Sequence, residues 1–229
     1  NTALPFPGSD RRGSLRDLSN SRDLSIVEYL AIIAFAITTC VTPGPNNAMI
    51  MASGLNYGIR KSVPHYLGIC LGFPAMVVAV GLGISQLFDR FPVLHVLLKL
   101  LGVAYLSYLA YKIATAPVTG SNETHGKPFT FVQAAAFQWV NPKAWVLAIG
   151  ATVTYTVLGE AYTSQVLLIA LIFLVFGAPC IMLWLWFGAS LKSILQKPEY
   201  VKIFNLSMAT LLMLSLIPVF LDLFEQFTN

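Results

Sequence analysis

The feature that most restricts the fold of this chain is a series of apolar runs, each long enough to cross a lipid bilayer. A spanning helix needs about 20 apolar residues. Six runs qualify, at residues 26–55, 63–88, 93–111, 129–157, 166–191 and 201–224. With 56% hydrophobic and 10% charged residues over 229 positions, the chain is far more apolar than a soluble domain. The sequence therefore predicts an all-α integral membrane protein with six transmembrane helices.

The first and fourth runs are too long to be single straight helices. At 1.5 Å per residue, each would extend roughly 45 Å, against a hydrocarbon core of about 30 Å. Each also carries a Pro and Asn cluster, at residues 42–47 and 138–143. Inside a bilayer, a helix is interrupted only where protein or a water-filled cavity receives the freed backbone groups. We expect both runs to be two half-helices joined by irregular backbone that lines a cavity.

The two broken runs occupy corresponding places in the two halves of the chain. A division after Tyr111 leaves three runs in each half, and each half begins with a broken one. Because three is odd, the second half enters the membrane from the opposite side, so any repeat is inverted. A single Pro is more often a simple kink, but matched interruptions in two halves mark the binding site of a transporter. The sequence predicts a transport site between the halves.

The residues of the two clusters suit a zwitterionic amino acid. A helix that restarts at Pro45 or at Asn141-Pro142 exposes unpaired amide donors and the positive end of its dipole, which favours a carboxylate. Neutral amide side chains can hold an ammonium and a carboxylate together. Lys143 either binds a carboxylate or snorkels towards the cytoplasmic face. The predicted substrate site comprises Thr42, Pro43, Gly44, Pro45, Asn46, Asn47, Gln138, Asn141, Pro142 and Lys143.

Other kinds of function find little support in the sequence. No GxxxxGK[ST] loop is present, so transport is coupled to an ion gradient or is facilitated. The three cysteines lie in apolar runs without CxxC spacing, so neither a metal site nor a cofactor is predicted. An intramembrane protease would have to use Ser85 with His65 or His95, and no GxSxG surrounds Ser85. An accessory subunit would leave the paired breaks unexplained, so we do not expect an enzyme or a scaffold.

The basic residues of the short loops predict the orientation in the membrane. Seven lie on the side of the loops between runs 1 and 2, 3 and 4, and 5 and 6: Arg60, Lys61, Lys112, Lys127, Lys192, Lys197 and Lys202. Arg90 alone lies in the other loops. The positive-inside rule then places those three loops in the cytoplasm, and we expect a lipid bilayer rather than a nucleic acid as the partner. Residues 1–25 are expected to be a disordered tail, residues 26–224 the transporter domain and residues 225–229 a short C-terminal tail.

Residues 26–224 resemble the LysE/RhtB family of amino-acid exporters. Thr42-Pro43-Gly44-Pro45-Asn46 is similar to the motif of the family's first segment, and Asn141-Pro142-Lys143 to its Asn-Pro motif in the fourth. The resemblance implies a multi-pass inner-membrane protein that exports amino acids or close derivatives in exchange for protons. We expect it to work by alternating access, one half rocking against the other around the two breaks.

The resemblance also bears on the substrate. Exporters of basic amino acids in this family tend to have an acidic residue just after the Asn-Pro break, where this chain has the apolar residues 144–147. A small neutral substrate is therefore expected, with a basic amino acid as the alternative. The sequence is similar to both the threonine/homoserine and the cysteine/O-acetylserine branches and does not choose between them. It also leaves the oligomeric state open, a homo-oligomer included.

Overall fold

A computed structural model describes residues 26–84, 90–115, 127–157, 159, 161–194, 197–217, 220–221 and 223–224. Every regular element within these ranges is a helix, which confirms the predicted all-α class. In chain order the elements are α1 (Ile26–Val41), α2 (Pro45–Ala79), η2 (Val80–Ile84), α4 (Pro92–Ala114), α5 (Phe131–Phe137), η3 (Gln138–Val140), α6 (Pro142–Tyr155), α7 (Tyr162–Ile172), η4 (Phe173–Gly177), α8 (Ala178–Ile194) and α9 (Pro198–Leu214). The expected tails, residues 1–25 and 225–229, lie outside the described residues. The arrangement of six spans as two inverted repeats remains a prediction.

The helix labelled α2 is a hairpin of two arms rather than one rod. Gly58 has φ 77° and ψ 171°, a backbone conformation that L side chains rarely adopt, and the chain reverses there. Ser53 and Ser62, on either side of it, lie with their hydroxyl oxygens 2.7 Å apart. In a continuous helix, nine residues would separate them by roughly 13 Å along the axis. The first predicted run therefore ends, and the second begins, at a turn of a single glycine.

Two stretches satisfy the length and hydropathy expected of membrane spans among the described residues. They are Pro45–Gly83 and Tyr162–Leu191. Because the chain reverses at Gly58, only the second arm of the first stretch is long enough to cross a bilayer by itself, at roughly 37 Å against about 20 Å for the first arm. The first arm therefore completes a span only together with α1, which precedes it across the break at residues 42–44. That pairing agrees with a predicted span made of two half-helices.

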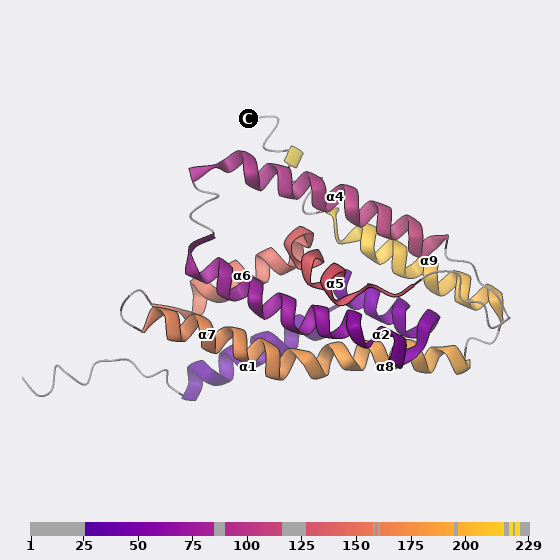
Figure 1. The fold of residues 1–229 in the computed structure, drawn as a ribbon, viewed down its shortest axis with the longest axis horizontal. Coiled ribbons are helices and arrows are strands. Elements are labelled where there is room, and N and C mark those ends of the chain that lie inside the picture. The colour runs from indigo at the N-terminus through magenta and orange to yellow at the C-terminus, as the bar shows by residue number, and fades with distance from the viewer. Residues whose placement is uncertain are drawn as a thin grey trace, which may run out of the picture.

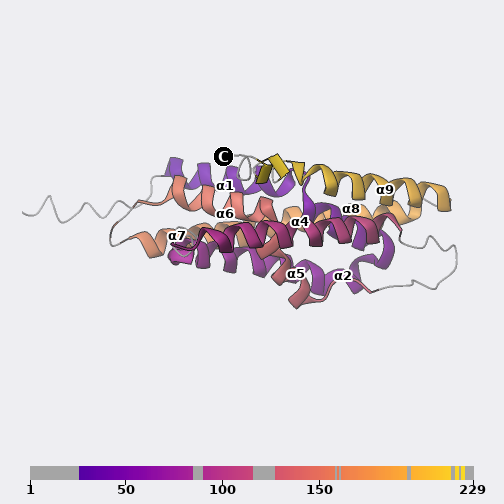
Figure 2. The ribbon, with the colours of Figure 1, turned by 90° about the horizontal axis from the view of Figure 1, so that it is seen from above.

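The helices form two groups around the short elements of the fourth run. α4 and α9 lie side by side along one edge, while α1, α2, α7 and α8 form the other group (Figures 1 and 2). α2 makes its most extensive contact with α8, and α5 packs against α2. The turn of α2, the C-terminal ends of α4 and α8 and the start of α9 lie towards one end of the molecule (Figure 1). This arrangement brings the predicted cytoplasmic basic residues to one end, which we call the basic end.

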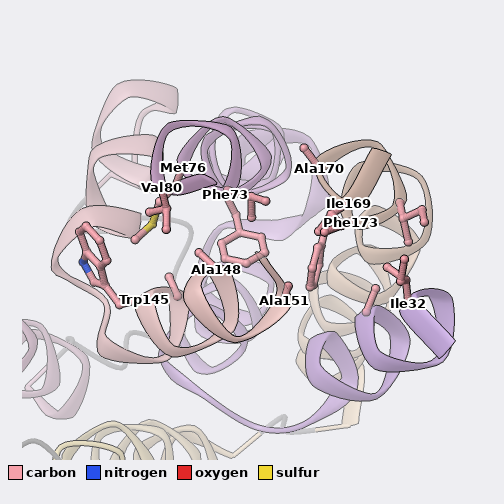
Figure 3. Close-up of a cluster of buried hydrophobic side chains, with 14 residues drawn as sticks. Ile32, Phe73, Met76, Val80, Trp145, Ala148, Ala151, Ile169, Ala170 and Phe173 are labelled. Carbon is pink, nitrogen blue, oxygen red and sulfur yellow. The ribbon is translucent and has the colours of Figure 1, made fainter. Parts of the chain in front are cut away.

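The largest core cluster lies between α2, α6 and the α7–η4 helix. Phe73 of α2 meets Phe173 edge to face, with ring centroids 4.9 Å apart and an interplanar angle of 82°. Ala148 and Ala151 present only methyl groups to these rings, so that α6 packs close to them (Figure 3). Phe35 of α1 adds a second edge contact to Phe173 at 6.2 Å. The cluster joins both halves of the chain on the side of the breaks away from the basic end.

Candidate functional site

The first break separates α1 from α2 and leaves the start of α2 uncapped. Gly44 is fully extended, with φ −177° and ψ −179°, and no side chain caps the helix that begins at Pro45. Within the described residues, the backbone N–H groups of Asn46 and Asn47 have no hydrogen-bond partner. The Asn47 side chain turns back instead, and its Nδ2 donates to the carbonyl oxygens of Cys40 at 2.8 Å and Thr42 at 2.9 Å. At this break the carbonyl oxygens of Cys40 and Thr42 therefore have hydrogen-bond partners, whereas the backbone N–H groups of Asn46 and Asn47 do not.

The break in the fourth run has the opposite pattern, because its backbone N–H groups are capped. Asn141 is extended, and its side-chain oxygen accepts from the backbone N–H of Lys143 at 3.1 Å. The Asn141 carbonyl accepts from the N–H of Ala144 at 3.0 Å. Pro142 has no N–H to satisfy, so the first turn of α6 has no free donor of its own. The expectation of bare amides at both restarts is therefore wrong for α6 and holds only for α2.

The two breaks meet in space through a reciprocal amide pair and a lysine. Asn46 Nδ2 donates to Gln138 Oε1 at 2.8 Å, and Gln138 Nε2 donates back to Asn46 Oδ1 at 3.1 Å. The Lys143 ammonium donates to the carbonyl of Thr42 at 2.7 Å and to that of Pro43 at 3.4 Å. Residues about a hundred positions apart are thereby brought into direct contact. As predicted, the two irregular segments lie against each other.

A small cavity of about 50 Å³ lies beside this contact. We call it the break cavity. By the usual measure it has room for a few water molecules, so an amino acid would need it to widen. Its polar wall comprises Thr39, Gly44, Asn46, Asn47, Asn141 and Lys143. None of the described residues that line it is acidic.

Comparison with known sequences agrees with this geometry. The sequence profile described as LysE type translocator matches residues 37–219. The chain belongs to this family. It is also 28% identical over 191 residues to proteins named cysteine/O-acetylserine efflux protein from Escherichia coli K12 and from Shigella flexneri and Shigella sonnei. The match covers 83% of this chain and 96% of each relative. No solved structure matches.

Membership of the LysE type translocator family confirms the resemblance recognised in the sequence and makes the chain a transport protein rather than an enzyme. The profile includes both breaks, so the matched region holds the whole contact between Asn46 and Gln138. Its helices are long and apolar enough for membrane spans. Which residues of the translocator touch a substrate remains a prediction.

The structure divides the predicted site residues of the translocator into two groups. Gly44, Asn46, Asn47, Asn141 and Lys143 line the break cavity. The others shape it without being part of its described lining: Thr42, Pro43, Pro45, Gln138 and Pro142. The amide of Gln138 also donates to the carbonyl of Ala134 at 2.9 Å, so both of its N–H groups are used, one towards Asn46 and one within its own helical segment.

Several residues of the cavity wall were not expected from the sequence. Cys40, Cys70, Phe73 and Phe173 form much of its apolar side. Phe173 begins η4, a π-helical segment within an otherwise continuous helix. Segments of this kind occur often at functional sites because they displace side chains out of the regular helical register. An unbroken apolar run gives no sign of such a segment, so a sequence pattern could not have found it.

Proposed function

We propose that this translocator exports small neutral amino acids or close derivatives, of the cysteine and O-acetylserine type, across the inner membrane in exchange for protons. The contact between the two breaks, beside a cavity with no carboxylate among its described lining residues, is the observation that carries the proposal. Interrupted helices whose amides and carbonyls face a common cavity are how secondary transporters bind small zwitterions. The names of the relatives supply the substrate class.

The substrate carboxylate is assigned to the donor-rich side of the break cavity. The free N–H groups of Asn46 and Asn47 and the positive end of the α2 dipole favour a negative group there. Asn141 adds a donor, because its Nδ2 has no partner among the described residues although the residue is only 2% exposed. The Lys143 ammonium, half-buried beside Gly44, contributes a full charge.

The substrate side chain is assigned to the apolar wall. Cys70, Phe73 and Phe173 leave a short, weakly polar surface that suits a thiol or a small ester. No carboxylate among the described lining residues is in place to pair with a second ammonium, so a basic amino acid would bring an unpaired charge into the membrane, which is strongly unfavourable. A neutral substrate is therefore favoured over lysine or arginine.

Alternating access requires one side of the site to be closed while the other opens. On the side away from the basic end, the rings of Phe35, Phe73, Phe173 and Tyr155 form a contiguous aromatic barrier. In this proposal the structure represents a state closed to that side. Rocking of one half against the other would part the aromatic rings and release the substrate there.

The test is efflux of radiolabelled amino acids from loaded cells that produce the native chain, Asn46→Ala or Asn141→Ala. We expect both variants to lose about tenfold or more of the export rate. Asn141→Ala removes a proposed hydrogen bond to the substrate carboxylate, worth roughly 1.5–3 kcal/mol. Asn46→Ala removes the pair with Gln138 that joins the two breaks and leaves the buried Gln138 amide partly unpaired, which costs about 1–3 kcal/mol. The substrate panel is threonine, homoserine, cysteine, O-acetylserine, lysine and arginine. Normal export by both variants at native protein levels would refute the site, and preferential export of lysine would refute the neutral substrate.

A further inference from the structure

A second and larger cavity, of about 350 Å³, lies nearer the basic end. We call it the vestibule. It lies between the first arm of α2, the C-terminal turn of α4 and the segment that leads into α5. The described residues that line it include two lysines, Lys112 and Lys127, and none that is acidic. A cavity with cationic groups and no carboxylate on its described wall attracts anionic groups.

The buried polar groups of the vestibule leave capacity for a ligand. His65 is only 2% exposed and lines the cavity, yet its Nδ1 has no hydrogen-bond partner among the described residues. Its ring instead packs against that of Phe129, with centroids 5.2 Å apart. A buried polar atom without a partner costs about 1–3 kcal/mol. An unpaired Nδ1 beside a cavity of this size is more typical of a binding site than of a packed core.

The vestibule and the break cavity share one face of a helix. Asn46 lines the break cavity, whereas Met49 and Ser53 line the vestibule. Positions 46, 49 and 53 are spaced three and four apart, so they lie on one face of the first arm of α2. One helical turn, roughly 5 Å along the axis, separates the wall of the break cavity from the wall of the vestibule. The reciprocal Asn46–Gln138 pair lies at the end of this face that borders the break cavity.

We propose that the vestibule is a capture site that binds the carboxylate of the transported amino acid before the substrate reaches the breaks. The proposal rests on the function proposed above and adds a second substrate site to it. Lys112 and Lys127 supply the charge, and His65 supplies a neutral hydrogen-bonding group deeper in the cavity. Lys112 lies over the ring of Tyr108, with Nζ 5.4 Å from the centroid, which keeps the ammonium near the cavity wall.

The test compares two pairs of lysines that carry the same charge. Inside-out membrane vesicles present the predicted cytoplasmic face to radiolabelled cysteine in a reducing buffer, and initial uptake is measured against concentration. In the Lys112→Gln/Lys127→Gln variant we expect the half-saturating concentration to rise about three- to tenfold, as for the loss of two partly exposed charged contacts. The maximal rate should stay within about twofold of native.

The control variant is Lys61→Gln/Lys202→Gln. Both of its lysines are exposed, lie on predicted cytoplasmic segments and are outside the described lining of the vestibule. It should keep the native half-saturating concentration. An equal rise in the half-saturating concentration of both variants would overturn the capture site, because it would reflect only the general electrostatic field of the protein surface. A lower maximal rate at unchanged half-saturation in the Lys112/Lys127 variant would overturn it as well.

A binding measurement separates this proposal from the proposed function. Equilibrium dialysis of the purified full chain with radiolabelled cysteine reports affinity without transport. If native vesicles accumulate no cysteine, the proposed function fails, while weaker binding by the Lys112/Lys127 variant alone would still support a carboxylate site in the vestibule. Equal binding by native, test and control proteins would refute that site.

Discussion

A buried carboxamide is stabilised when its oxygen and its nitrogen are both paired, and Asn46 and Gln138 achieve this by facing each other. Interhelical hydrogen bonds in membranes contribute about 0.6 kcal/mol on average. Two such bonds hold the breaks together without locking them. An interaction of this strength suits a contact that must separate and re-form during transport.

Gly44 leaves the room that the Lys143 side chain occupies. A Cβ at position 44 would lie 2.8 Å from Cδ of Lys143 and 3.1 Å from Nζ. The backbone of Gly44 is extended, which any residue can adopt, so Gly44→Ala acts by contact alone. Because Lys143 is flexible, it should move away from the carbonyls of Thr42 and Pro43, and the protein should still fold.

We therefore expect Gly44→Ala to insert normally but to export cysteine about tenfold more slowly, in line with the loss of a charge-assisted hydrogen bond. Efflux rate per inserted molecule is the measurement. Gly150→Ala is the matched control, because a Cβ there meets nothing within 4 Å. Native export by Gly44→Ala would show that the position of Lys143 does not matter for transport.

At the scale of helices, the contact between α2 and α8 depends on the absence of side chains at two positions. A Cβ at Gly188 would lie 2.1 Å from the carbonyl oxygen of Met51. A Cβ at Gly54 would lie 2.4 Å from that of Leu185. Backbone atoms cannot rotate out of the way as a side chain can, so the two helices would have to separate.

Gly188→Ala should consequently lower stability by about 1–3 kcal/mol, the usual range for overpacking a core. The measurement is the midpoint of thermal unfolding of the purified protein in detergent. Gly150→Ala should raise this midpoint or leave it unchanged, since alanine is intrinsically the better helix former by about 1 kcal/mol. Equal midpoints for the two variants would mean that α2 and α8 do not pack this closely.

The sequence predicted those elements whose cause is local. Each break combines proline with asparagine, so the breaks at residues 42–44 and at Asn141 could be located from their letters alone, whereas single prolines lie inside α2 without interrupting it. The reversal at Gly58 lies within the predicted loop between runs 1 and 2, but its single-glycine geometry could not be predicted, because Gly54 and Gly58 have the spacing of a helix-packing motif and only Gly54 is used in that way. The capping of α6 depends on which way the Asn141 side chain turns, which its neighbours in sequence do not determine.

The walls of the two cavities were predictable only in part. Their polar residues belong to the breaks, but Cys70, Phe173 and His65 reach them through contacts between distant elements. His65 lies near the start of the second apolar run in the sequence, yet it is buried beside Phe129. The register of packed helices decides such positions, and periodicity in a single apolar run does not encode it.

For the molecule as a whole, the basic end predicts the orientation in the membrane. Single cysteines introduced at Lys61 and Arg90, in a chain whose native Cys40, Cys70 and Cys180 are replaced by serine, would report the two sides. A membrane-impermeant maleimide should label position 90 in intact cells and position 61 only in inside-out vesicles, as the positive-inside rule requires. Labelling of position 61 from outside would reverse the orientation and with it the side to which the vestibule opens.

The uncapped start of α2 has a consequence for selectivity. In the proposed site its free amides would bind the carboxylate that all amino acids have in common, while the substrate side chain would meet only a short apolar surface. Discrimination by such a surface is weak, about 1–3 kcal/mol for each methylene. A protein built in this way would export whichever small amino acid is in excess instead of selecting a single metabolite.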